Sequence, residues 1–149
     1  MISSKDEIHY LSIDDFRIIF DQLASAQQEY SDDLPPFNTR YIGKLESIIS
    51  QVQSTYFGKE LYTGFVAKAA IFFYLINKDH PFVNGNKRIS VVALYEFIER
   101  NVSELYISEE ALSNDLFEMA IKTAGSLPDD MDKIINYLQE KISSFIVTL

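Results

Sequence analysis

Cysteine is absent from this 149-residue chain, which excludes disulfide bonds and thiol chemistry. Positive charge is also scarce, because 13 Lys and Arg residues face 22 Asp and Glu residues, a formal net charge of −9 at pH 7. A protein that wraps nucleic acid needs a basic face, so this balance argues against nucleic acid as a partner. Long hydrophobic runs are missing too. The longest apolar runs, such as residues 69–76, are far too short to span a bilayer, and we expect no membrane partner.

The rest of the composition is that of an ordinary globular domain. Hydrophobic residues make up 47% of the chain and charged residues 23%, and the length suits one buried core. We therefore expect residues 1–149 to form a single domain without repeats or linkers. The first residues show no basic segment followed by an apolar one, so we expect no export and a cytoplasmic location, which the lack of cysteine also fits.

Apolar residues recur at helical spacing along most of the chain, which favours an all-α fold. The predicted helices cover residues 13–23, 45–49, 65–76, a segment ending near Asn101, residues 109–121 and a last segment through Ile142. Ser12, Thr63 and Ser108 are the expected N-caps of the first, third and fifth of these helices. Gly125 is expected to stop the fifth helix, and Pro128 to lie in the first turn of the last. The helix over 65–76 is apolar almost all round, which predicts a core helix. The helical period fails over residues 51–62, where the pattern predicts a small β-hairpin.

The most informative stretch is residues 80–88, His-Pro-Phe-Val-Asn-Gly-Asn-Lys-Arg, which joins two apolar helices. A helix N-terminus leaves backbone N–H groups unpaired and carries partial positive charge, so it binds phosphate. Gly85 lets the backbone approach an anion closely, and Asn86 can cap the helix or hold the loop. Lys87 adds a point charge and Arg88 a guanidinium suited to gripping two phosphate oxygens. These features predict an anion site, although the spacing of a P-loop is absent.

His80 lies five residues before Gly85, so the turn can bring its imidazole toward the anion. A neutral His, with an unperturbed pKa of about 6.5, can accept a proton from an attacking hydroxyl. We expect Phe82 to pack between the two helices and anchor the loop. Each residue alone has an ordinary explanation, since loop histidines are usually exposed and Asn-Gly is a common turn. Their order between two buried helices indicates a phosphate-handling enzyme.

This stretch resembles the motif of the Fic/Doc (Fido) family, His-x-Phe-x-(Asp/Glu)-(Gly/Ala)-Asn-(Gly/Lys)-Arg. The matching positions are His80, Phe82, Gly85, Asn86, Lys87 and Arg88. Residues 45–47, 57–62 and 97–101 also look like the Doc-like, or death-on-curing, branch. The resemblance implies a compact helical Fido fold in which the hairpin is a flap that aligns a target chain by strand addition.

The family transfers part of a nucleotide onto a protein hydroxyl. The resemblance therefore implies that His80 is the general base and that residues 85–88 hold the nucleotide phosphates. It implies ATP or another nucleoside triphosphate and Mg²⁺ as cofactors. The implied partners are a target protein with a reactive hydroxyl, of the translation machinery in Doc-type toxins, and an antitoxin acting in trans.

Two positions separate three functional hypotheses. Lys87 stands where AMP-transferring members usually have glycine, and Doc-type members carry Lys there and pass the γ-phosphoryl group of ATP to a Ser or Thr. The leading hypothesis is thus a Doc-type phosphotransferase, and the first alternative a Fic-type AMP transferase. Asn84 replaces the Asp or Glu that usually binds Mg²⁺, and its amide oxygen can bind the metal but lacks the charge. The second alternative is therefore a catalytically attenuated domain that binds a nucleotide or a partner.

Overall fold

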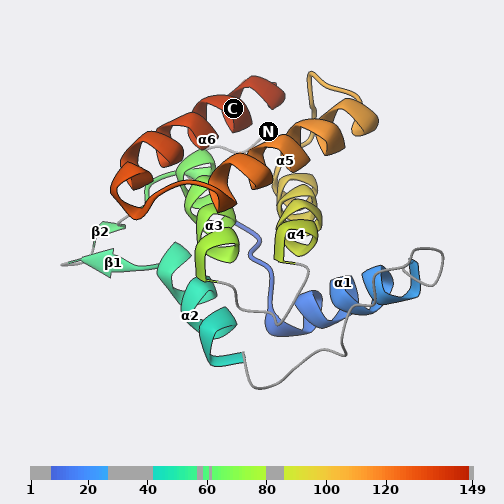
Figure 1. The fold of residues 1–149 in the computed structure, drawn as a ribbon, viewed down its shortest axis with the longest axis horizontal. Helices are drawn as coiled ribbons and strands as arrows, with labels where there is room; N and C mark the ends of the chain where they lie inside the picture. Colours follow the sequence, from blue (N-terminus) through green and yellow to red (C-terminus); the bar gives the residue numbers. More distant parts are fainter. Residues whose placement is uncertain (1–7, 27–41, 57–58, 61, 80–85, 148–149) are drawn as a thin grey trace.

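The computed structural model describes residues 8–26, 42–56, 59–60, 62–79 and 86–147. The helices are α1 (Ile13–Ala26), α2 (Ile42–Val52), α3 (Phe65–Asp79), α4 (Asn86–Asn101), α5 (Glu109–Ala124) and α6 (Met131–Phe145), with a short 3₁₀ turn, η3 (Pro128–Asp130), before α6 (Figure 1). Strands β1 (Thr55–Tyr56) and β2 (Lys59–Glu60) complete the elements. None of these described helices is both long and apolar enough to cross a membrane.

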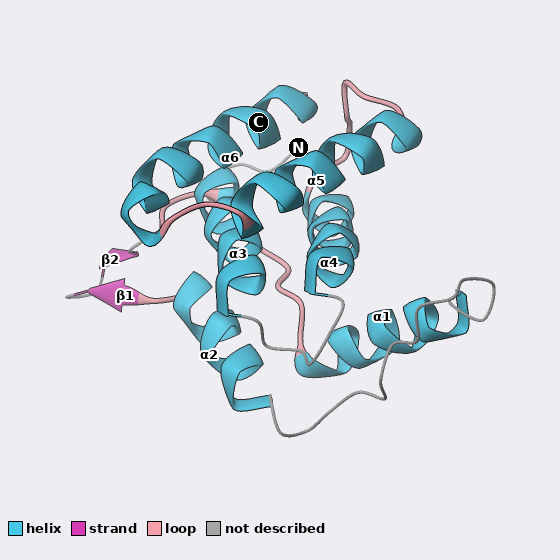
Figure 2. Ribbon diagram, in the orientation of Figure 1, coloured by secondary structure: helices cyan, strands magenta, loops and turns pink. Residues whose placement is uncertain are grey.

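The predicted all-α architecture with a small hairpin is confirmed. The two strands pair antiparallel, with Thr55 opposite Glu60 and Tyr56 opposite Lys59. They stand to one side of the helices rather than between them (Figure 2). The hairpin is shorter than the predicted 51–62, because α2 continues to Val52, whose buried side chain packs in the core.

Helix α3 is the centre of the molecule. Phe65 and every residue from Lys68 to Asn77 are buried, as expected for a helix that is apolar almost all round. Helices α2, α4, α5 and α6 all pack against it. Phe72 of α3 contacts Phe16 of α1, with ring centroids 5.8 Å apart, and Phe97 of α4, at 5.5 Å. These tilted and edge-on aromatic contacts join three helices in one core.

The helix boundaries confirm several predicted caps and correct two. Ser12 Oγ accepts a hydrogen bond from the Asp15 N–H at 3.2 Å, and an Asp15 carboxylate oxygen accepts one from the Ser12 N–H at 2.8 Å, a reciprocal capping box. Ser108 caps α5 in the same manner through the Ala111 N–H, and Gly125 ends it.

Thr63 and Pro128 do not have the roles that the sequence predicted. Gly64, with φ of +84°, lies directly before α3, and its carbonyl accepts from the Lys68 N–H at 3.2 Å. The helix begins at Phe65 as predicted, but the residue directly before it is Gly64, with the left-handed backbone that glycine permits, rather than the predicted cap Thr63. Pro128 begins the separate turn η3 rather than the first turn of α6.

The side chain of Asn101 closes the end of α4. Its amide oxygen accepts from the His9 N–H at 2.8 Å, and its amide nitrogen donates to the His9 carbonyl at 2.9 Å and to the Phe97 carbonyl at 2.8 Å. Asn101 is thus bonded to the segment that precedes α1, 92 residues away in sequence. Near the other terminus, the Tyr106 N–H donates to the Phe145 carbonyl at 2.8 Å, which holds the end of α6.

An ion pair joins the first turn of α1 to the end of α4. Both terminal nitrogens of the Arg100 guanidinium donate to Asp15, at 3.0 and 3.1 Å. Hydrogen bonding from Arg100, aided by the Ser12 N–H, lowers the pKa of Asp15 from 3.8 to about 2, although partial burial opposes the shift. Since the folded state holds this carboxylate ionised, the pair stabilises the fold at neutral pH.

We predict that Asp15→Asn lowers the free energy of unfolding by roughly 1 kcal/mol at pH 7, after allowance for solvent screening of a partly exposed pair. The asparagine keeps an acceptor for the Ser12 N–H but loses the charge. Because the folded pKa of Asp15 lies below the unfolded value, this contribution is present above about pH 4 and is lost as the pH falls toward 2. Urea unfolding of both proteins from pH 7 to pH 2 measures the difference.

The matched control is Glu96→Gln, which removes the other carboxylate paired with Arg100, at 3.3 Å on the exposed surface of α4. We expect a loss of at most about 0.5 kcal/mol there, as for other exposed pairs one helical turn apart. If the difference in the free energy of unfolding between wild type and Asp15→Asn is the same at pH 2 as at pH 7, the ionised Asp15 carboxylate is not its source.

Candidate functional site

The candidate site lies where α3 ends and α4 begins. Helix α3 ends at Asp79, α4 begins at Asn86, and the two ends lie at the same end of the molecule (Figure 1). Both helices are largely buried and pack against each other. Residues 80–85 therefore join two helices that pack firmly against each other. His80, Phe82, Asn84 and Gly85 fall within residues 80–85, outside the described residues, so the roles predicted for them stay predictions.

The first turn of α4 carries the remaining motif residues. Asn86 and Arg88 are half-buried, and Lys87 is exposed. This 16-residue helix has no acidic side chain in its own first turn to offset the positive end of its dipole. Two cationic side chains, those of Lys87 and Arg88, therefore lie at the positive end of this helix dipole. The arrangement suits a group with several negative oxygens, such as a chain of phosphates.

Buried neighbours orient this turn. Ile89 and Ser90 are both fully buried. The Ser90 hydroxyl donates to the carbonyl of Lys87 at 2.7 Å. With the following residues held in the core, the helix presents the Lys87 side chain to solvent. The charge of Lys87 is thus available at the surface beside the motif.

Lys78, in the last turn of α3, bonds to backbone carbonyls outside its own helix. Its ammonium donates to the carbonyl of Ser126 at 2.6 Å and to that of Ala124 at 3.5 Å. Lys78 thereby ties the last turn of α3 to the connection after α5. In this structure it supports the helix that leads into the motif.

A cleft beside the motif is lined by residues that the sequence did not single out. It has a volume of about 510 Å³ and is bounded by Gly43, Lys44, Ser47, Lys78 and Asp79. The Lys44 ammonium donates to the carbonyl of Asp79, the last residue of α3, at 3.3 Å. No local pattern marks Lys44, because its contact exists only once α2 packs against α3.

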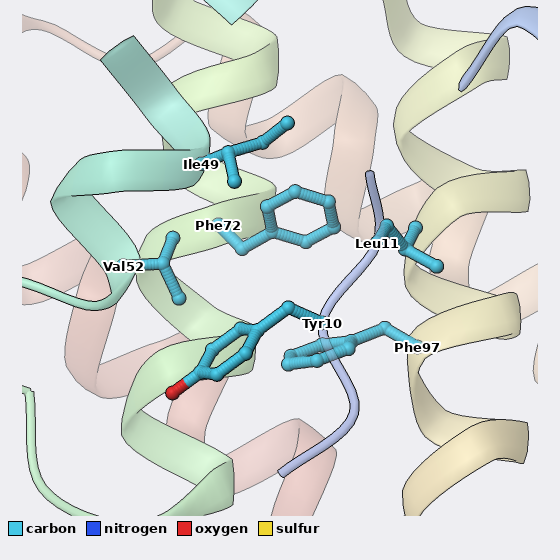
Figure 3. Close-up of a pocket in the computed structure, with 6 residues that line it drawn as sticks. All are labelled: Tyr10, Leu11, Ile49, Val52, Phe72 and Phe97. Carbon is cyan, nitrogen blue, oxygen red and sulfur yellow. The ribbon is translucent and has the colours of Figure 1, made fainter. Parts of the chain in front are cut away.

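Two other hollows suit a nucleotide poorly. The first, among Tyr10, Leu11, Ile49, Val52, Phe72 and Phe97, is apolar and has a volume of about 10 Å³, room for roughly one water molecule (Figure 3). The second is a groove of about 500 Å³ between α4 and α5 whose lining includes Glu109 and Glu110. Tyr95 donates a hydrogen bond to Glu109 there, and this bond together with burial raises the pKa of the Tyr95 phenol. Two carboxylates at this groove would repel phosphates.

No group of three or more His, Cys, Asp or Glu side chains in the described part of the chain is placed to hold a metal ion. The described residues of the motif offer positive charge and N–H donors instead. They therefore fit the phosphates of a nucleotide better than they fit a bare cation.

Comparison with known protein families identifies one match. Residues 10–98 match the Fic/DOC family, a stretch that covers more than half of the chain. It spans the described parts of α1 and α2, the hairpin, α3 and most of α4, and so includes both helices that flank the motif. Neither a curated protein nor a solved structure matches the chain. On the family match, the protein belongs to the Fic/DOC family.

Proposed function

We propose that this protein is a Doc-type transferase that moves the γ-phosphoryl group of ATP to a Ser or Thr hydroxyl of a target protein, with His80 as the general base. Family membership supports a transferase of the Fido type in general. The observation that carries the finer proposal is the start of α4, where exposed Lys87 and half-buried Arg88 lie in a first turn without an acidic side chain. This is a site for a polyphosphate next to the predicted base.

The proposed reaction has a simple course. The target hydroxyl oxygen forms a bond to the γ-phosphorus, and its proton passes to a ring nitrogen of His80. The bond between the γ-phosphorus and the oxygen that bridges to the β-phosphate breaks, and ADP leaves. N–H groups at the start of α4, with Lys87 and Arg88, hold the phosphates and the charge that develops on them. Catalysis of this type depends on positioning and electrostatics, which a loop between two buried helices can supply.

Magnesium would be held mainly by the phosphates of the nucleotide, with the side-chain carbonyl of Asn84 as the protein ligand. Mg²⁺ commonly binds through substrate phosphates and one or two carboxylates, and it keeps several waters. When bound, it neutralises charge on the phosphoryl oxygens.

Lys87 favours transfer of the γ-phosphoryl group over transfer of AMP. Its side chain is exposed at the start of α4, and it needs space that a smaller residue would leave free. In AMP-transferring relatives glycine usually stands at this position, and the space takes a β-phosphate. A lysine there counts against that pose and favours the reversed nucleotide of Doc-type members.

The hairpin supplies a means of aligning the target. In the described sheet each strand has one strand neighbour, so an extended chain can add alongside. We infer that the target chain binds in this way, with its hydroxyl directed at the motif. The proposal further includes a target in the translation machinery, an antitoxin that acts in trans and a cytoplasmic location, where ATP is available.

The first test is label transfer into the proteins of a cell lysate, with Mg²⁺ and ATP labelled at either the α- or the γ-phosphate. We expect a labelled protein band with γ-label only. His80→Ala should reduce its rate by about 10²- to 10⁴-fold, the usual contribution of a general base. Circular dichroism of the variant checks that the fold is kept. A band with α-label would show nucleotidyl transfer, and a band that survives in His80→Ala would show that another group is the base.

A second candidate function, a domain that binds nucleotide without efficient transfer, is favoured by Asn84 alone. If the missing carboxylate limits the reaction, Asn84→Asp should raise the rate of γ-label transfer by at least about tenfold and lower the Mg²⁺ concentration needed for half-maximal rate. Asn114→Asp, which adds the same charge on the exposed face of α5, is the control and should change neither quantity.

Three results are distinguishable in that comparison. Transfer by wild type with no gain in Asn84→Asp means that the asparagine is a sufficient ligand. Transfer only in Asn84→Asp means that the natural protein is attenuated. No transfer by either protein, together with ATP binding measured by calorimetry, supports the binding domain and removes the phosphotransferase.

A further inference from the structure

A buried lysine lies at the base of the hairpin. Lys68 of α3 is 1% exposed, and its ammonium donates to the carbonyl of Val52 at 3.2 Å. Val52 is the last residue of α2, and β1 begins three residues later at Thr55. The ammonium also lies 5.9 Å from the ring centroid of Tyr10. A charge removed from water is costly unless it is well paired, so this position calls for a specific role.

The bonds at the end of α2 show why Lys68 matters there. Three of the last four carbonyls of α2 accept hydrogen bonds from the residues that follow the helix. The Ile49 carbonyl accepts from Gln53 Nε2 at 3.4 Å, and the Gln51 carbonyl accepts from the Ser54 N–H at 3.1 Å. The Ser50 carbonyl accepts from both the Gln53 N–H and the Ser54 hydroxyl, at 3.1 Å each. The fourth, that of Val52, is met by the cation from α3. Carbonyls at a helix C-terminus carry partial negative charge, so a cation is well suited to them. Lys68 therefore bonds the end of α2 to the central helix of the molecule.

A second lysine makes the reverse connection at the other end of α2. Lys44, in the first turn of α2, donates to the carbonyl of Asp79, which directly precedes His80. Helix α2, with 11 residues, thus contacts α3 through one lysine near the motif and another near the hairpin. Its length is about 16 Å at 1.5 Å per residue, which makes α2 a rigid spacer between motif and hairpin.

We propose that Lys68 is a positioning residue that sets the place of the β1–β2 hairpin relative to the motif at residues 80–88, and hence the pose of the target chain. This inference rests on the proposed function, in which the hairpin aligns the target. Lys68 acts through the backbone of Val52. Because Lys68 is buried, removal of its ammonium leaves the Val52 carbonyl without this donor.

The position of the hairpin can be measured without any substrate. Because the chain has no cysteine, Lys59→Cys in β2 and Glu140→Cys on the exposed face of α6 take spin labels at two chosen positions. In this labelled background, Lys68→Met keeps side-chain length but removes the ammonium. We expect the distance distribution between the labels to widen about twofold or to shift, as local order at the hairpin is lost.

Lys78→Met is the matched control for this measurement. It removes another ammonium of α3 that bonds backbone carbonyls, those of Ala124 and Ser126, away from the hairpin. Its distance distribution should equal that of the unsubstituted background. If Lys68→Met does not fold, Lys68→Arg, which keeps the charge but places its donors differently, is measured instead, and a shifted distribution is expected. An unchanged distribution in the Lys68 variant overturns the proposal.

The effect on the reaction is a separate readout. For the target identified by label transfer, Lys68→Met should raise KM by about tenfold with kcat changed less, whereas the Kd for ATP stays within about twofold. A merely structural role would lower the active fraction instead, leaving KM unchanged. A displaced hairpin with an unchanged KM would remove the link to target binding. If wild type transfers no label, the proposed function fails, and the spin-label distances still decide whether Lys68 positions the hairpin.

Discussion

The burial of α3 is the constraint on which the rest of this structure depends. A helix that is apolar around nearly its whole circumference is stable in water only when other elements cover every side. Helices α2, α4, α5 and α6 provide that cover, and α1 reaches the same core through the contact of Phe16 with Phe72. Once α3 is enclosed, its two ends are the places where the chain can emerge. One leads into the motif at residues 80–88, and the other follows the hairpin.

Three lysine side chains fix α3 to the elements that enclose it. Lys44, Lys68 and Lys78 each join α3 to a neighbouring segment by an ammonium-to-carbonyl hydrogen bond, at 3.3, 3.2 and 2.6 Å respectively. Lysine suits this use because its long stem packs along apolar surface while its charged end reaches a helix C-terminus. In a chain with only 13 basic residues, several are thus committed to structure. Lys87 and Arg88, at the start of α4, belong to the motif itself.

Much of the fold could be predicted because its signals are local. Ser12 and Ser108 cap α1 and α5 through side-chain bonds to residues three positions on, and the loss of helical period after α2 correctly indicated a hairpin. The predictions failed where two local options compete. Thr63 has the chemistry of a cap, but Gly64 offers a left-handed backbone and takes the position before α3. Pro128 fits a first helical turn equally well as α-helix or 3₁₀, and the chain forms the latter.

The sequence by itself determined the family, the order of the helices and the motif, because each rests on residue types at short, regular spacing. Only the tertiary structure decided which lysines are structural. The partners of Lys44, Lys68 and Lys78 are backbone carbonyls 35, 16 and 48 residues away, and every residue has such a carbonyl. Nothing in the side-chain sequence can therefore mark the partner. The pairing follows from how α2 and α5 pack against α3.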